Sequence, residues 1–238
     1  MTRVAIVQSN YIPWKGYFDL LDSVDEFVLY DTAQYTRRDW RNRNQIKTPH
    51  GPQWLTVPVQ AKGQYLQAIR DTRIDGTGWA AAHWRAIHQN YARAAYFADF
   101  AHELRALYLD RRYVYLSELN AELLGWVAGQ LGTSTRVTSS ADYAFGDGRS
   151  ERLLDICRQA GADVYVSGPA ARDYLDEAMF AAAGIGVEWF EYPEYPDYPQ
   201  LWGEFTHQVT VLDVLFNCGP AAPDHALLNR HQALHHAG

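Results

Sequence analysis

The chain has 238 residues, of which 47% are hydrophobic and 21% charged, and its formal net charge is −7. This length and balance predict one α/β domain that buries a substantial core and carries an insertion. A general nucleic-acid binder is disfavoured, because phosphate backbones require a basic face. Two cysteines cannot form a disulfide framework, and no apolar stretch is long enough to cross a bilayer. Without a recognisable signal peptide, a cytoplasmic location is expected.

The first elements predict a βαβ unit. Residues 3–8 form a short apolar run typical of a buried strand, 16–22 read as a short helix, and 26–31 as a second buried strand. Residues 53–60 and 66–74 are predicted to pair as a hairpin.

Helical spacing of apolar residues then predicts helices over 79–96, 97–109 and 116–131. We take about 77–115 as a helical insertion into the domain.

The second half alternates more regularly. Short strands are predicted at 135–138, 163–166 and 187–190. The intervening helices are predicted at 150–160, with Ser150 as N-cap, and at 170–183, and a final helix at 205–216. This rhythm predicts a Rossmann-like, doubly wound, mostly parallel sheet over residues 1–219, with 220–238 as a C-terminal tail.

The first candidate site is the loop from Gln8 to Phe18, which follows the first strand and enters a helix. Ligands bind outside the carboxyl ends of strands in such sheets, and a helix N-terminus suits an anion such as phosphate. The alternative is an ordinary aromatic turn packed on the sheet. The candidate residues of this loop are Gln8, Asn10, Tyr11, Trp14, Lys15, Gly16 and Tyr17.

Asp31 stands at the end of the second predicted strand. A carboxylate at this place meets a ribose hydroxyl in many nucleotide-binding folds, although it can also cap a turn. We therefore count Asp31, with Tyr11 and Lys15, among the candidate catalytic residues.

The second candidate is the basic segment 37–47, which carries five cations and one anion in an acidic protein. Arginine can grip phosphate or carboxylate with two parallel hydrogen bonds. A solvated charged face is the common alternative, and a nucleic-acid patch ranks lower. The binding residues predicted here are Arg41, Arg43, Asn44 and Lys47.

The third candidate is the segment 167–174, which follows another strand end and should lie at the same sheet edge. Ser167, Gly168 and Tyr174 are its predicted binding residues, and Ser150 and Arg152 should reach the same edge. A plain strand–helix turn is the alternative.

Other chemistry is not indicated. The histidines are scattered without metal-ligand spacing, so no metal is expected. There is no readable Ser-His-Asp set, and neither a Gly-x-x-x-x-Gly-Lys-Ser/Thr phosphate loop nor a Gly-x-Gly-x-x-Gly motif is present.

Taken in order, several motifs resemble the WbqC-like family over about residues 3–219. The resemblance rests on Gln8, Tyr11, Pro13-Trp14, Gly16-Tyr17-Phe18, Tyr30-Asp31, Tyr35, Trp40, Arg43-Asn44, Trp54 to Val59, Asn90-Tyr91, Tyr96-Phe97, Ser150 to Leu154, Ser167-Gly168, Tyr174, Phe180, Leu212 to Asn217 and Gly219.

This resemblance implies a place in surface-polysaccharide or natural-product biosynthesis, and it adds Tyr35 to the candidate binding residues. It carries over no catalytic residue. A fainter resemblance links the Pro13 to Tyr17 loop to the nucleotidyltransferase and class I synthetase superfamily. The two histidines that bind phosphates there are missing, so Lys15 and the arginines would have to replace them.

Two main hypotheses follow. The chain is a transferase or amide-forming ligase that uses a phosphate-bearing donor, which could be a nucleotide, a nucleotide-sugar or a carrier-bound acyl or aminoacyl group. Alternatively, it is a non-catalytic protein that binds a nucleotide-sugar or a partner of the same pathway. The expected partners are a small-molecule substrate and, further, a carrier protein or pathway enzyme; the sequence does not identify the cofactor.

Overall fold

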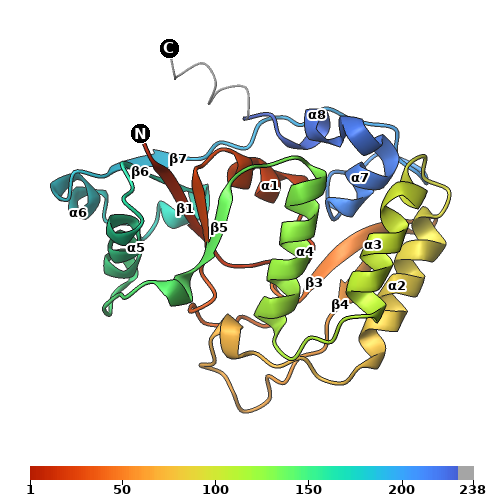
Figure 1. The fold of residues 1–238 in the computed structure, drawn as a ribbon, viewed down its shortest axis with the longest axis horizontal. Coiled ribbons are helices and arrows are strands. Elements are labelled where there is room, and N and C mark those ends of the chain that lie inside the picture. The colour runs from red at the N-terminus through yellow and green to blue at the C-terminus, as the bar shows by residue number, and fades with distance from the viewer. Residues whose placement is uncertain (230–238) are drawn as a thin grey trace.

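The computed structural model describes residues 1–229 and contains a five-stranded parallel sheet in the order β5-β2-β1-β6-β7 (Figure 1). Counted along the chain within this sheet, the order is 3-2-1-4-5, the Rossmann order, so the predicted fold class is confirmed. The strands are β1 (Arg3–Val7), β2 (Glu26–Leu29), β5 (Arg136–Ser139), β6 (Val164–Ser167) and β7 (Gly186–Trp189).

Alternate strand residues enter two separate cores, because successive side chains of a strand point to opposite faces. Ala5, Phe27 and Val166 join the larger core, whereas Val28 and Tyr165 join the smaller one. The larger core packs against α1 (Lys15–Asp22) and α4 (Leu116–Gln130), and the smaller one against α5 (Arg149–Gln159) and α6 (Glu177–Ala182). The sheet is therefore covered on both faces, as predicted.

The chain between β2 and β5 carries the hairpin and the helical insertion. The hairpin pairs β3 (Arg43–Thr48) with β4 (Gly51–Thr56), and α2 (Gly78–Tyr91) and α3 (Phe97–Leu109) pack beside it (Figure 1). The prediction that 66–74 forms the partner strand was wrong. Residues 69–71 form a 3₁₀ turn, and the two segments share an isolated bridge between Val59 and Ile74 in place of a strand ladder.

Several helix boundaries also differ from the predictions, and α2 ends at Tyr91 instead of residue 96. Gly148, with φ 104°, precedes α5 as its N-cap, and Ser150 lies inside the helix. The helix predicted over 170–183 begins only at Glu177, after a short 3₁₀ turn at Pro169–Ala171. The last long helix predicted at 205–216 is α7 (Leu212–Cys218).

The segment 191–200, which we call the strap, has no regular structure and joins β7 to the C-terminal elements. Beyond α7, a 3₁₀ turn (Gly219–Ala221) and α8 (Ala222–Ala226) follow, and Ala222, Ala226 and Leu227 are buried in the larger core. The beginning of the predicted tail is thus packed, while 230–238 lie outside the described residues. No helix within residues 1–229 has the length and apolar character needed to cross a membrane.

Candidate functional site at the carboxyl edge of the sheet

The strand order reverses between β1 and β6, and this switch point is where doubly wound sheets bind ligands. The loop that follows β1 begins at Gln8, and the loop that follows β6 begins at Gly168. Two of the three predicted segments therefore leave the sheet at neighbouring strand ends, as expected.

Asp31 ties the β2 end to the β1 loop. It is buried, and its Oδ1 accepts the Ser9 backbone N–H at 2.9 Å. Burial raises the pKa of the Asp31 carboxyl, while the Ser9 hydrogen bonds and the Arg41 charge act in the opposite direction. A carboxylate with a raised pKa at a strand end can accept a proton from a nucleophile.

Arg41 brings a positive charge to the same loop. Its side chain is 13% exposed, and its guanidinium donates to Asn10 Oδ1 and lies 3.7 Å from Asp39 Oδ2. Burial lowers the pKa of Arg41, which Asp39, Tyr17 and Asp31 partly offset. The Arg41 Nε has no hydrogen-bond partner among residues 1–229. A buried guanidinium N–H without a protein acceptor favours an anionic oxygen placed beside it.

Tyr17 and Tyr192 form the aromatic wall beside these charges. The Tyr17 hydroxyl donates to the Gln8 carbonyl at 3.1 Å, and burial raises its pKa well above the ordinary value. The Tyr192 ring lies 5.3 Å from Trp14, and a Cβ on Gly168 would stand 3.8 Å from the Tyr192 hydroxyl. Tyr192 thus bridges the loops that follow β1 and β6.

Gly16 has a packing role. A Cβ at this position would lie 2.4 Å from the Trp14 indole, so glycine is needed for the tryptophan to fold back over the start of α1. The Trp14 ring therefore occupies the space beside Gly16 that the predicted ligand contact would use.

Residues on the other face of the sheet supply further cations. Arg152 donates to the Gly146 carbonyl and to Asp147, and its pKa is raised by hydrogen bonds to Asp147 and Tyr30. Ser150 accepts the Asp176 backbone N–H at 3.0 Å. The half-exposed Tyr174 has the Arg149 guanidinium 5.9 Å from its ring centroid. Arg152 and Tyr30 connect this group to the end of β2. Ser150 and Ser167 are both buried, so they lie within the fold and not on its surface.

Asn44 and Asn120 hold the β1 loop in place. Asn44 Nδ2 donates to the carbonyls of Ile12 at 2.8 Å and Tyr11 at 3.3 Å. Asn120 Nδ2 donates to Ser9 Oγ and to the Arg41 carbonyl, both at 3.0 Å, while its Oδ1 has no partner within the described part of the chain. Asn44 is therefore a clamp on the loop, and Asn120 was not predicted. A lone asparagine within the apolar stripe of α4 was the available signal.

Tyr11 points away from the switch point. Its hydroxyl lies 2.5 Å from the Tyr108 hydroxyl and 2.8 Å from His83 Nδ1, in a fully buried group. Burial lowers the pKa of His83 to about 4, so the ring is neutral near pH 7. The Thr56 carbonyl accepts a hydrogen bond from His83, which leaves Nδ1 to accept the Tyr11 proton. This trio joins the β1 loop to the helical insertion.

Lys15 is covered by the strap. Its Nζ lies 3.5 Å from the Pro196 carbonyl oxygen. It also lies 4.9 Å from the ring centroid of Tyr195 and 5.0 Å from that of Tyr198. Burial lowers its pKa to about 8. The structure does not join Lys15 to Asp31 or Arg41, so its position gives no support to a phosphate-binding role like that of the synthetase-superfamily histidines.

Lys47 belongs to the same internal network as Asp213. Its Nζ donates to Gln200 Oε1 and to the Glu204 carbonyl. Asp213 is fully buried and accepts hydrogen bonds from Tyr91 and Tyr198, both at 2.8 Å, and from Gln200 at 2.7 Å. Lys47 is thus engaged inside the fold.

The remaining predicted residues lie on the outer part of the basic segment. Tyr35 is buried, and Arg37, Asp39 and Arg43 lie near enough to shift the pKa of its hydroxyl, which burial raises. The Arg43 guanidinium stacks 4.2 Å from the Trp54 ring centroid and donates to the Arg38 carbonyl.

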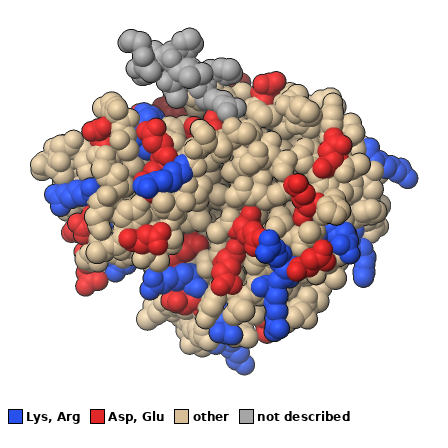
Figure 2. Space-filling view, viewed as in Figure 1, with Lys and Arg blue, Asp and Glu red and all other residues tan. Residues whose placement is uncertain are grey.

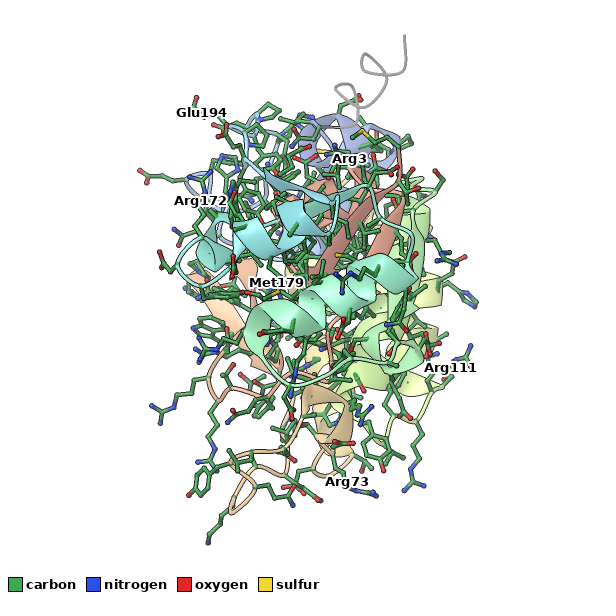
Figure 3. The ribbon with its side chains drawn as sticks, turned by 90° about the vertical axis from the view of Figure 1, so that its left-hand side faces the viewer. Arg3, Arg73, Arg111, Arg172, Met179 and Glu194 are labelled. Carbon is green, nitrogen blue, oxygen red and sulfur yellow. The ribbon has the colours of Figure 1, made fainter. Side chains whose placement is uncertain are left out.

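Charges of both signs are interspersed over the face shown in Figure 2, without a broad area of one sign. Figure 3 places Glu194, in the strap, and Arg73, in the segment between β4 and α2, at opposite ends of the molecule. The strap and that segment are therefore separate regions.

The chain has relatives among known proteins. The chain is 57% identical over 225 residues to the uncharacterized protein Rv1507c of Mycobacterium tuberculosis (strain ATCC 25618 / H37Rv), which covers 94% of this chain and 97% of that protein. No solved structure matches the chain at a significant level. Residues 8–225 match the profile of the WbqC-like protein family, and the chain belongs to this family.

Proposed function

We propose that the chain is a transferase or amide-forming ligase that binds a phosphate-bearing donor at the carboxyl edge of the sheet. The observation that carries this proposal is Arg41, a mostly buried guanidinium that is held against the β1 loop and keeps Nε unpartnered among residues 1–229. Its guanidinium contacts Asn10 of the loop that follows β1, and this loop leaves the Rossmann-ordered sheet at the switch point, where fixed cations and loop N–H groups suit an anion.

Asp31 completes the proposed chemistry. The acceptor's amine or hydroxyl attacks the donor, the bond to the phosphate-bearing leaving group breaks, and the proton of the acceptor passes to the Asp31 carboxylate. The raised pKa of Asp31 favours this role. Holding both substrates at this edge contributes to the rate through proximity, which can lower a barrier by roughly 7–11 kcal/mol. The family resemblance favours a surface-polysaccharide or natural-product pathway.

The proposal is tested first by binding. Thermal unfolding with pyrophosphate, ATP, nucleotide-sugars and acyl-CoA should show stabilisation by one donor class, about 2.7 kcal/mol at roughly 100 times its dissociation constant. Stabilisation by none of these compounds contradicts the proposal and turns attention to protein partners.

Turnover then separates an enzyme from a binding protein. With the donor that binds, release of its phosphate-bearing product should be followed in the presence of small amines and sugars. Asp31→Asn should keep donor binding and abolish release, because the amide can still accept the Ser9 N–H but is a poor base. A wild-type protein that binds the donor and releases nothing with any acceptor supports the binding-protein alternative.

A further inference from the structure

Two tryptophans beside the candidate site are exposed in the part of the chain that the structure describes, residues 1–229. Trp40 is 47% and Trp54 41% exposed, and their ring centroids are 5.5 Å apart with planes tilted by 35°. The Arg43 guanidinium lies 4.2 Å from the Trp54 ring centroid. We call Trp40, Trp54 and Arg43 the aromatic platform. Tryptophan carries a large apolar surface, and an adjacent exposed pair is typical of a recognition surface.

Hydrogen bonds fix two of the platform side chains, Trp54 and Arg43. Trp54 lies on β4 opposite Gln45 of β3. In the amide orientation that satisfies its neighbours, Gln45 accepts the Trp54 indole N–H at 3.1 Å and donates to the Gln208 carbonyl at 3.1 Å. Arg43 is fixed by its bond to the Arg38 carbonyl. A prearranged ring surface loses little entropy when a flat ligand stacks on it.

The platform is continuous with the phosphate site proposed above. The Trp40 carbonyl accepts the Tyr11 backbone N–H at 2.9 Å, so Trp40 is fastened to the β1 loop. The next residue, Arg41, contacts Asn10 of the same loop. A ligand whose anionic part meets Arg41 therefore has a ring-binding surface within reach.

The chemistry of the platform favours a planar aromatic ring over a sugar ring. Sugar hydroxyls need several free directional partners, but Gln45, which contacts Trp54, is already engaged by Trp54 and Gln208. Indole faces and a stacked guanidinium suit a nucleobase, whose stacking is independent of its exact edge pattern.

We propose that the aromatic platform binds the base of a nucleoside phosphate whose phosphates are held by Arg41. This inference rests on the proposed function and narrows its donor to the nucleotide class. It assigns recognition roles to Trp40 and Trp54, and it makes Arg43 a positioning residue that supports the Trp54 ring.

The test compares phosphate compounds with and without a nucleobase on the full chain by titration calorimetry. ADP, UDP, inorganic pyrophosphate and glucose 1-phosphate are titrated into the wild-type protein. The two nucleotides should bind at least tenfold more tightly than pyrophosphate and should quench tryptophan fluorescence. Trp40→Ala and Trp54→Ala should each weaken nucleotide binding roughly tenfold and leave pyrophosphate binding unchanged.

Two controls keep the result interpretable. Tyr65→Ala removes an aromatic side chain that is 67% exposed and lies outside the platform, and it should leave all affinities unchanged. Trp40→Phe and Trp54→Phe keep a stacking face and should retain most of the nucleotide affinity even where an alanine variant unfolds.

Each contrary result has a distinct meaning. Equal affinity for nucleotides and pyrophosphate, both lost in Arg41→Gln, overturns the platform while leaving the phosphate site intact. Glucose 1-phosphate binding as tightly as the nucleotides, with the same loss in the tryptophan variants, overturns the nucleobase assignment. Absence of binding by every phosphate compound overturns both this inference and the proposed function.

Discussion

The carboxyl edge and the strap-covered region both bury charged side chains, but they satisfy them differently. Under the strap, the Asp213 carboxylate collects donors from Tyr91, Tyr198 and Gln200. At the carboxyl edge, Arg41 Nε and Asn120 Oδ1 find no partner within residues 1–229. A buried polar atom without a partner costs free energy, whereas a satisfied network rigidifies a fold. The Asp213 network under the strap therefore stabilises the fold, whereas the unpartnered atoms beside the β1 loop support the proposal that a ligand binds there.

The largest effect is expected from a variant that removes the Asp213 carboxylate from its hydrogen-bond network. Asp213→Ala removes the shared acceptor of the buried Tyr91 and Tyr198 hydroxyls and of the partly buried Gln200 amide, so we expect a loss of roughly 3 kcal/mol or more in the free energy of unfolding. Chemical denaturation measures it. Asp173→Ala, which removes an exposed aspartate, is the matched control and should change stability by less than about 0.5 kcal/mol. A small effect at Asp213 would mean that the network contributes little.

The second prediction concerns the pH dependence of stability that His83, on α2 of the helical insertion, should cause. His83 has a folded pKa of about 4 against 6.5 for the free side chain, so between these values the unfolded state binds more protons. Stability should therefore fall as the pH falls from 6.5 to 4, by about 3 kcal/mol from this group.

His83→Gln should remove that part of the pH dependence, measured by urea unfolding at pH 7 and pH 5. His88→Gln, which replaces an exposed histidine on the same helix, should retain it. Identical slopes for the wild type and His83→Gln would show that His83 does not titrate in this window.

The smallest effect concerns one donor of the satisfied network. Tyr198→Phe removes a single hydrogen bond to Asp213 and leaves Tyr91 and Gln200 in place, so we expect a loss of about 1 kcal/mol. Equilibrium unfolding of this variant beside Tyr174→Phe, whose ring is half exposed, gives the comparison. A loss as large as that of Asp213→Ala would show that the donors act as one unit.

Much of the fold could be predicted, because local patterns specify it. The apolar runs at 3–8 and 26–31 became β1 and β2, and the regular alternation of the second half became β5, β6 and β7 with their crossover helices. The hairpin partner was missed because the strand Arg43–Thr48 is mostly polar, and it contacts α2 and the C-terminal segment outside the main sheet. Ser150 was misjudged as a cap because Gly148, with its positive φ, ends the preceding loop two residues earlier.

The candidate site was predicted only in part, for a physical reason. Strand ends locate loops at one edge, so Gln8, Asp31 and Gly168 could be placed together from sequence. The direction of each side chain depends on distant partners. Lys15 turns toward the strap some 180 residues later in the chain, and Tyr11 turns toward His83 and Tyr108. No local pattern indicates which buried side chains find such partners and which stay free.

The proposed role of Arg41 as a ligand-binding residue is tested most directly by two measurements on the same samples of Arg41→Gln. Pyrophosphate or nucleotide affinity should fall by about 10- to 100-fold, as expected for a charge-assisted hydrogen bond, while the free energy of unfolding should change by no more than about 1 kcal/mol. Arg85→Gln, which replaces an exposed arginine on α2, should change neither quantity. Unchanged ligand affinity, or a loss of several kcal/mol in stability, would contradict the account and make Arg41 a structural residue.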